Sequence, residues 1–187
     1  MGKIILPAKA KLFIGIIAIN SISFSDLKDI LTSNWGEIDL ESEVFKFDKT
    51  NYYENEMGKD LIKKFFSFKK LIERENLPEI KLRTNQIEKE FKINKNKEGR
   101  DINLDPGYIT LSSVVLATTK DYRHRIYHSK GIYLENTLYY DSKKKSYTEW
   151  DWTYPDYRQD NYKEFFNRMR EIYHNQLKYG EEFNIVD

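Results

Sequence analysis

The chain has 187 residues, of which 40% are hydrophobic and 33% are charged, and it contains no cysteine. This length is typical of one domain, and the apolar content excludes an intrinsically disordered chain. The 31 basic and 30 acidic residues leave a net charge of +1, so neither nucleic acid nor an anionic membrane is favoured as a partner. The lack of cysteine excludes disulfides and thiolate catalysis and indicates a reducing, cytoplasmic location.

The chain opens with a predicted strand and helix. Residues 12–19, LFIGIIAI, are a continuous apolar run of the kind found in a central strand buried on both faces. Two lysines precede it, as in a signal peptide, but the run is much shorter than the roughly 20 residues that span a bilayer. The next segment predicts a helix that begins near Ser23 or Ser25 and ends at Gly36. Residues 43–48 alternate in polarity and predict a half-buried strand.

The rest of the chain predicts one more internal helix, several strands and a final helix. Residues 61–72 fit either a helix or a strand, and their aromatic content favours the strand. A helix is expected after Asn76, with Pro78 in its first turn, and residues 92–100 are expected to form a basic loop. Strands are expected at residues 110–119 and 131–141, a hairpin strand at 146–150, and a last helix from Asp160. These elements predict a single α+β domain over residues 1–187, with a largely antiparallel mixed sheet and helices packed against it.

Acidic residues gather in FDKTNYYENEMG, residues 47–58. Asp48, Glu54 and Glu56 follow a predicted strand, and Glu54 and Glu56 would share a face if the strand continued. Oxygen ligands of this kind suit Mg²⁺ or Mn²⁺ bound together with a phosphate. The sequence therefore predicts a metal site at Asp48, Glu54, Glu56 and Asp105, and solvated surface acids are the alternative.

The segment RDINLDPGY, residues 100–108, combines turn residues with polar ones. Pro106 and Gly107 fit the central positions of a type II turn. The polar residues before them alternate along the chain, so a strand would direct Asp101, Asn103 and Asp105 toward a common ligand, with Arg100 beside them. Ion pairing with the basic segment that follows is the alternative.

A cationic segment, TKDYRHR, supplies candidate groups for a phosphate or carboxylate ligand: Lys120, Arg123, His124 and Arg125. A solvated basic loop is the alternative. His124 and His128 would suit a metal only on a helix, because in a strand their Cα atoms lie roughly 13 Å apart. In WTYPDYR, residues 152–158, the aromatic side chains form either a stacking platform with Arg158 at its edge or a loop packed on the core.

Familiar nucleotide signatures are missing. The segment EMGKDL lacks the first glycine and the hydroxyl of a phosphate-binding loop, and no G-x-G-x-x-G pattern is present. Five segments nevertheless resemble, in order and spacing, the bacterial domain-of-unknown-function family 4416: FDKTNYYENEMG, GRDINLDPGY, LATTKDYRHRIY, GIYLENTL and WTYPDYR. Members of that family sometimes carry the label GTP-binding protein, which the sequence does not support, because NKEG has Gly99 where a guanine-reading aspartate would stand.

Two functional hypotheses follow. In the first, the acids bind a divalent metal while the cations hold a phosphorylated small molecule or nucleotide, for binding or for turnover. In the second, the polar groups form structural ion pairs and the protein is a non-enzymatic binding module for a protein or nucleotide partner. The oligomeric state is not determined by the sequence.

Overall fold

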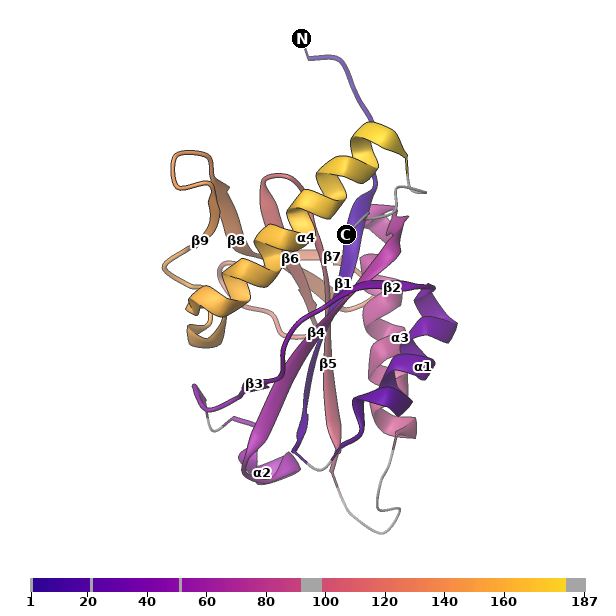
Figure 1. Cartoon of the computed structure of the whole chain (residues 1–187), viewed down its shortest axis with the longest axis vertical. Helices are drawn as coiled ribbons and strands as arrows, with labels where there is room; N and C mark the ends of the chain where they lie inside the picture. Colours follow the sequence, from indigo (N-terminus) through magenta and orange to yellow (C-terminus); the bar gives the residue numbers. More distant parts are fainter. Residues whose placement is uncertain (1, 21, 51, 92–98, 181–187) are drawn as a thin grey trace.

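In the computed structural model, the described residues are 2–20, 22–50, 52–91 and 99–180. Within these ranges the chain forms one domain, with a nine-stranded sheet and four α-helices (Figure 1). Every strand pair is antiparallel. The predicted α+β class is therefore confirmed.

The strands are β1 (Ala10–Ile19), β2 (Ile38–Glu41), β3 (Phe45–Lys46), β4 (Leu61–Ile72), β5 (Ile102–Ile109), β6 (Ser113–Thr118), β7 (Ile126–Ser129), β8 (Ile132–Asp141) and β9 (Ser146–Glu149). The helices are α1 (Phe24–Trp35), α2 (Glu54–Met57), α3 (Leu77–Glu90) and α4 (Asp160–Tyr179), with short 3-10 helices η1 (Arg74–Asn76) and η2 (Pro155–Arg158). The strand order is β2-β4-β1-β5-β6-β8-β7, while β3 also pairs with β4 and β9 with β8.

The sheet lies between two layers of helices (Figure 1). On β1, Leu12, Ile14 and Ile16 pack in one cluster with residues of α1 and α3. Phe13, on the opposite face, packs with Phe166 of α4, and their ring centroids are 4.9 Å apart. The apolar run at the start of the chain is thus a central strand buried on both faces, as its composition predicts.

Most other elements match their sequence patterns. Residues 61–72 form a strand, α3 follows Asn76, and α1 ends at Gly36, whose φ of 89° is readily adopted only by glycine. The strand predicted at residues 43–48 is shorter: Phe45 and Lys46 form its ladder with β4, and the Phe47 N–H adds one hydrogen bond to the Leu61 carbonyl. Of the predicted basic loop, residues 92–98 lie outside the described residues.

The predicted type II turn at Pro106 and Gly107 is wrong, because both residues lie inside β5. The hydrogen bonds of Leu104 show how the sheet accommodates the proline. Its N–H donates to Glu88 Oε1 (2.7 Å) and its carbonyl accepts from Lys81 Nζ (2.8 Å), so both groups point away from β1. Backbone groups two residues apart in a strand point to the same side, so the missing N–H of Pro106 also faces away from β1. The proline costs the β1–β5 ladder no hydrogen bond.

On that side β5 pairs with β6 only from Gly107 to Ile109. Toward the start of β5 the two strands diverge, and side chains of α3 replace the missing ladder partner at Leu104. A cavity lies in this opening of the sheet.

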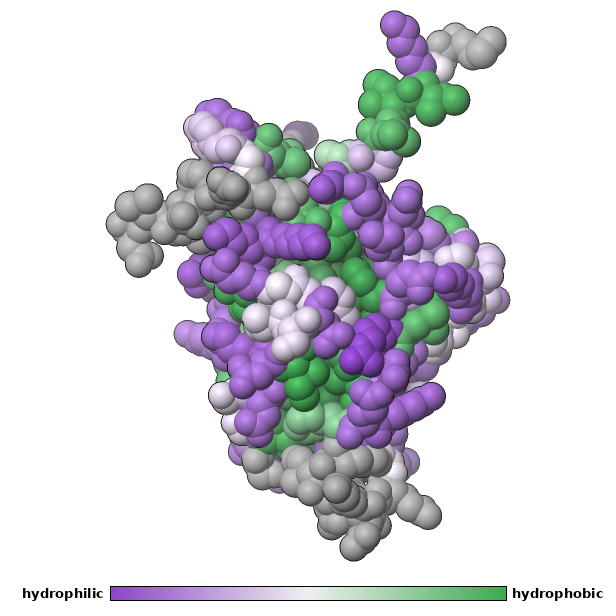
Figure 2. Space-filling view, turned by 90° about the vertical axis from the view of Figure 1, so that its right-hand side faces the viewer, coloured by the Kyte–Doolittle hydropathy of each residue, from purple (hydrophilic) through white to green (hydrophobic). Residues whose placement is uncertain are grey.

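Figure 2 shows the molecule from the right-hand side of Figure 1, where α1 and α3 lie. Hydrophilic residues surround a hydrophobic strip on this face, and a separate hydrophobic segment projects at the top. That segment contains Ile4, Ile5 and Leu6, whose side chains are exposed. None of the helices in the described part of the chain is long and apolar enough to cross a membrane.

Candidate functional site

A cavity of about 420 Å³ lies where β5 and β6 diverge. Its walls come from β4, β5, β6 and β8, from α3, and from the segments around residues 47–53 and 154–157. The volume lies within the range of small-molecule sites. Five of the residues singled out in the sequence line it: Arg100, Asn103, Asp105, Lys120 and Arg125.

Two buried charges of the cavity wall form an ion pair. Lys63 on β4 is 1% exposed, and its Nζ lies 2.6 Å from Asp156 Oδ2. The same ammonium lies 4.3 Å from the ring centroid of Tyr157. The sequence does not reveal this pair, because residues 61–72 fit either a helix or a strand, and only a strand places Lys63 opposite Ile17 of β1.

Arg100 holds one wall of the cavity together. Its guanidinium donates to both oxygens of Glu56, at 2.7 and 2.9 Å, to Glu88 Oε2 at 2.6 Å and to Asn103 Oδ1 at 3.0 Å. Glu56 lies in the helix α2, so the prediction that Glu54 and Glu56 share a strand face is wrong. The ion pair of Glu56 with Arg100 joins α2 to the segment that leads into β5.

A second buried carboxylate, Glu135 on β8, binds two side chains of the segment before β7. Glu135 is 1% exposed and accepts from Arg125 Nε at 2.8 Å, while His124 Nε2 lies 3.1 Å from the same oxygen. Arg125 also donates to the hydroxyl of Tyr154. The imidazole of His124 stacks on Trp152, with an interplanar angle of 16°. One sequence signal for this cluster was available, namely a glutamate in the middle of a strand rich in aliphatic and aromatic residues, IYLENTLYYD.

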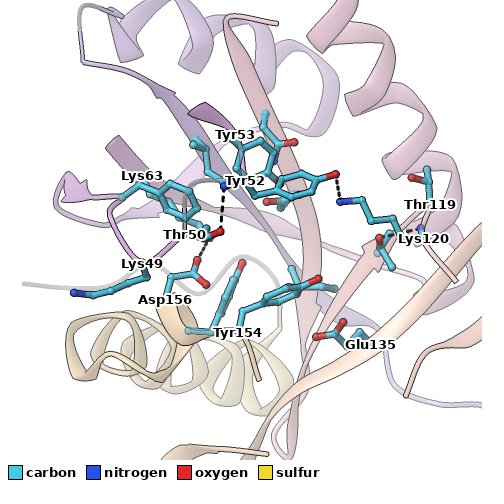
Figure 3. A pocket seen from close by; sticks show the side chains of 18 of the residues that line it. Lys49, Thr50, Tyr52, Tyr53, Lys63, Thr119, Lys120, Glu135, Tyr154 and Asp156 are labelled. Atoms are coloured by element: carbon cyan, nitrogen blue, oxygen red, sulfur yellow. Dashed lines mark hydrogen bonds and ion pairs between the residues drawn. The ribbon is translucent and has the colours of Figure 1, made fainter. Parts of the chain in front are cut away.

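Lys120 differs from the other cations of the cavity. Its Nζ donates to the hydroxyl of Tyr52 at 2.7 Å and lies 3.9 Å from the centroid of that ring. Figure 3 shows this contact, with Tyr154 on the other side of the pocket. Among the described residues, no carboxylate lies within ion-pairing distance of Lys120. This ammonium is therefore available to an anionic ligand.

Two polar atoms of the cavity wall are buried without a hydrogen-bond partner in the described part of the chain: Asn103 Nδ2 and the hydroxyl of Tyr157. The bond from Arg100 to Asn103 Oδ1 fixes the orientation of the amide and leaves its NH₂ group free to donate. Such groups are costly to bury unpaired.

The remaining predicted site residues lie elsewhere. Asp48 pairs with Lys46 and Lys49 on the surface, at 3.8 and 3.2 Å. Arg158 donates to the carbonyls of Thr153 and Asp151, at 2.8 Å each, and so holds its own turn. Those outside the cavity lining are Asp48, Glu54, Glu56, Arg123, His124 and Arg158.

The four predicted metal ligands are not gathered at one point. Of these acids, only Asp105 lines the cavity. In the ranges that the structure describes, no group of three or more histidine, aspartate or glutamate side chains is arranged to hold a metal ion. His124 and His128 also have different neighbours, since His124 contacts Glu135 and His128 Nδ1 contacts Ser129 Oγ.

The buried tyrosines predict a loss of stability in alkali. Burial raises the pKa of several tyrosines above the ordinary value of 10.0, most strongly for Tyr53, Tyr147, Tyr157 and Tyr162. Their neutral form is favoured in the folded state, so the associated stability is present in full below pH 10 and is lost as pH rises above it. We expect the free energy of unfolding to fall by about 1.4 kcal/mol per pH unit for each such tyrosine. Urea titrations at pH 8 to 11 measure this slope, and a flat profile above pH 10 contradicts it.

A family model for the domain of unknown function DUF4416 matches residues 8–173. The chain belongs to this family. The match runs from just before β1 into α4 and includes every residue of the DUF4416 cavity described above. No curated protein and no solved structure shows a significant match to the chain. The function of this DUF4416 domain must therefore be argued from the site itself.

Proposed function

We propose that the cavity binds a small phosphorylated molecule or nucleotide, with its phosphate at Lys120. The observation that supports this most directly is the ammonium of Lys120, which lines the cavity and contacts a tyrosine in place of a carboxylate. Thr118 and Thr119, beside it in the chain, line the same cavity and carry hydroxyl groups that can donate to phosphate oxygens.

The charge of the cavity wall supports an anionic ligand. The wall contains six cationic residues, Lys49, Lys63, Lys81, Arg100, Lys120 and Arg125, and three acidic ones, Asp105, Glu135 and Asp156. Cations in a concave, partly apolar site attract anions, because the surrounding protein screens charge less than water does. The rings of Tyr52 and Tyr154, on opposite sides of the pocket (Figure 3), supply apolar surfaces for the rest of the ligand.

A divalent metal ion would bind to this site together with the phosphate of the ligand. Mg²⁺ is commonly bound by one or two carboxylates together with substrate phosphates, and Asp105 is the one predicted acid placed to contribute. We propose binding as the activity of the site. The role of the metal is tested by measuring the affinity for the phosphate ligand with added Mg²⁺ and with a chelator. A ligand held through Asp105 and Mg²⁺ binds more weakly when the chelator removes the metal.

Replacement of Lys120 by methionine is expected to weaken phosphate-ligand binding by about tenfold or more, since a hydrogen bond to a charged group contributes about 1.5–3 kcal/mol. Isothermal titration with pyrophosphate, ribose 5-phosphate and AMP measures the loss. Lys143→Met is the matched control, because Lys143 lies exposed in the β8–β9 turn, away from the cavity. Equal affinities in both variants would exclude Lys120 from the site.

The non-enzymatic binding module for a protein partner is the second candidate. A specific observation favours it: Lys63, Arg100 and Arg125 are each paired with a carboxylate, as structural ion pairs would be. If none of the phosphate compounds shifts the melting temperature of the wild-type protein, this candidate becomes the better one.

A further inference from the structure

The floor of the cavity contains hydrogen-bonding groups that a phosphate does not need. Asn103 and Asp105 lie two residues apart on β5, so their side chains point to the same face. They pair across the ladder with Ile17 and Gly15 of β1, on the face where Phe13 packs against α4. Both residues line the cavity.

Two of the floor groups are donors. Asn103 is 4% exposed, and its Nδ2 has no hydrogen-bond partner among the described residues. Tyr157 is 2% exposed, and its hydroxyl is likewise without a partner there. Burial, with the nearby carboxylates of Asp105 and Asp156, raises the pKa of Tyr157 well above its ordinary value. The phenol therefore keeps its proton and can donate.

The third floor group is an acceptor. The side chain of Asp105 is 26% exposed, and its ion pair within the described ranges is with Lys81 Nζ, at 3.8 Å. No described side chain donates a hydrogen bond to the Asp105 carboxylate. Lys81, the nearest cation, donates to the Leu104 carbonyl instead. A carboxylate has about four acceptor positions, so this one can accept from a ligand.

Two donors and a carboxylate acceptor suit hydroxyl groups, because each hydroxyl both donates and accepts a hydrogen bond. Without a bridging metal ion, by contrast, a phosphate oxygen is repelled by the charge of Asp105. Lys120 and Asp156 lie on opposite sides of the pocket (Figure 3), and Asp156 is followed in the chain by Tyr157. The Lys120 ammonium and the segment that carries Tyr157 therefore lie on different sides of the cavity.

We propose that the ligand is a sugar phosphate, either free or as the ribose phosphate of a nucleotide, whose hydroxyl groups bind to Asn103, Asp105 and Tyr157 while its phosphate binds to Lys120. This inference rests on the proposed function, from which it takes the position of the phosphate.

The test is a set of calorimetric titrations that separates the two halves of the ligand. Ribose 5-phosphate, glucose 6-phosphate and AMP carry both halves, methyl phosphate carries only the phosphate, and free ribose and glucose carry only hydroxyls. We expect at least one compound with both halves to bind about tenfold or more tightly than methyl phosphate, because buried polar groups discriminate strongly against a ligand that leaves them unpaired. AMP compared with ribose 5-phosphate distinguishes the nucleotide from the free sugar phosphate.

Asp105→Asn is the informative variant, since it keeps the shape of the side chain and removes the carboxylate. We expect it to reduce the affinity for the sugar phosphate about tenfold and to leave that for methyl phosphate unchanged or higher. Tyr157→Phe provides a second variant that removes one donor and is expected to act in the same direction. The melting temperature of each variant is measured in parallel to confirm that it is folded.

The outcomes distinguish this inference from the proposed function. If methyl phosphate binds as tightly as every sugar phosphate and Asp105→Asn changes neither affinity, the hydroxyl site is wrong while the phosphate site stands. If a sugar phosphate binds no more tightly than its free sugar, Asp105→Asn weakens both and Lys120→Met weakens neither, the hydroxyl site stands and the phosphate site is wrong. If no compound binds the wild-type protein, both are wrong.

Discussion

Asp156→Asn is expected to lower the free energy of unfolding by about 3–5 kcal/mol, as breaking a buried ion pair from one side does. The asparagine keeps the shape of Asp156 but leaves the ammonium of Lys63, 1% exposed, without its counter-charge. Aromatic rings around that ammonium, at 4.3 Å for Tyr157 and 5.3 Å for Phe65, offset only part of the loss. Urea denaturation followed by circular dichroism measures the change.

Two further variants make this test specific to burial. Asp48→Asn removes a carboxylate whose side chain is 44% exposed and which pairs with Lys49, so we expect a change below about 0.5 kcal/mol. Lys63→Met combined with Asp156→Asn removes both charges, and this double variant should be more stable than Asp156→Asn alone. A loss below 1 kcal/mol for Asp156→Asn would mean that water reaches Lys63 and relieves the charge.

The second large effect is expected for Gly107→Ala, at about 1–3 kcal/mol of lost stability, the usual cost of inserting atoms into a packed interior. A Cβ on Gly107 would lie 2.5 Å from the Val115 carbonyl oxygen and 2.6 Å from Phe13 Cζ. The oxygen belongs to β6 and cannot retreat without disturbing the β5–β6 pairing, which spans only Gly107 to Ile109. Thermal and urea unfolding measure the cost.

Gly15→Ala is the matched control, because Gly15 lies on the neighbouring strand opposite Asp105. Its added Cβ would meet side-chain atoms, the nearest at 3.0 Å on the Phe65 ring, and those atoms can shift by small rotations. We expect a smaller loss than for Gly107→Ala. Equal losses would show that β6 yields as readily as a side chain, which would contradict a rigid β5–β6 junction.

Local patterns were sufficient to predict most elements of this fold. The β-branched run before Ile19 determined a buried strand, and the spacing of Phe165, Phe166 and Met169 determined the face that α4 buries. These patterns work because the alternation of a strand and the turn of a helix are properties of the local backbone. The short segments were harder. Glu54 and Glu56 follow a strand-like stretch but lie in a single helical turn that ends at Gly58.

The sequence alone also selected several of the polar residues that the cavity gathers, including Asn103, Asp105 and Lys120. The tertiary structure alone decided their partners. Arg100 is joined to Glu56, 44 positions away, and Lys63 to Asp156, 93 positions away, and no local pattern encodes such separations. The tertiary structure also decided the conformation of Asp-Pro-Gly. By local preference this tripeptide forms a turn, but its pairing with β1 keeps it extended. The proline and the glycine of this strand are accommodated for different reasons. Pro106 lies where the ladder to β6 stops, and Gly107 lies where the two strands must come close.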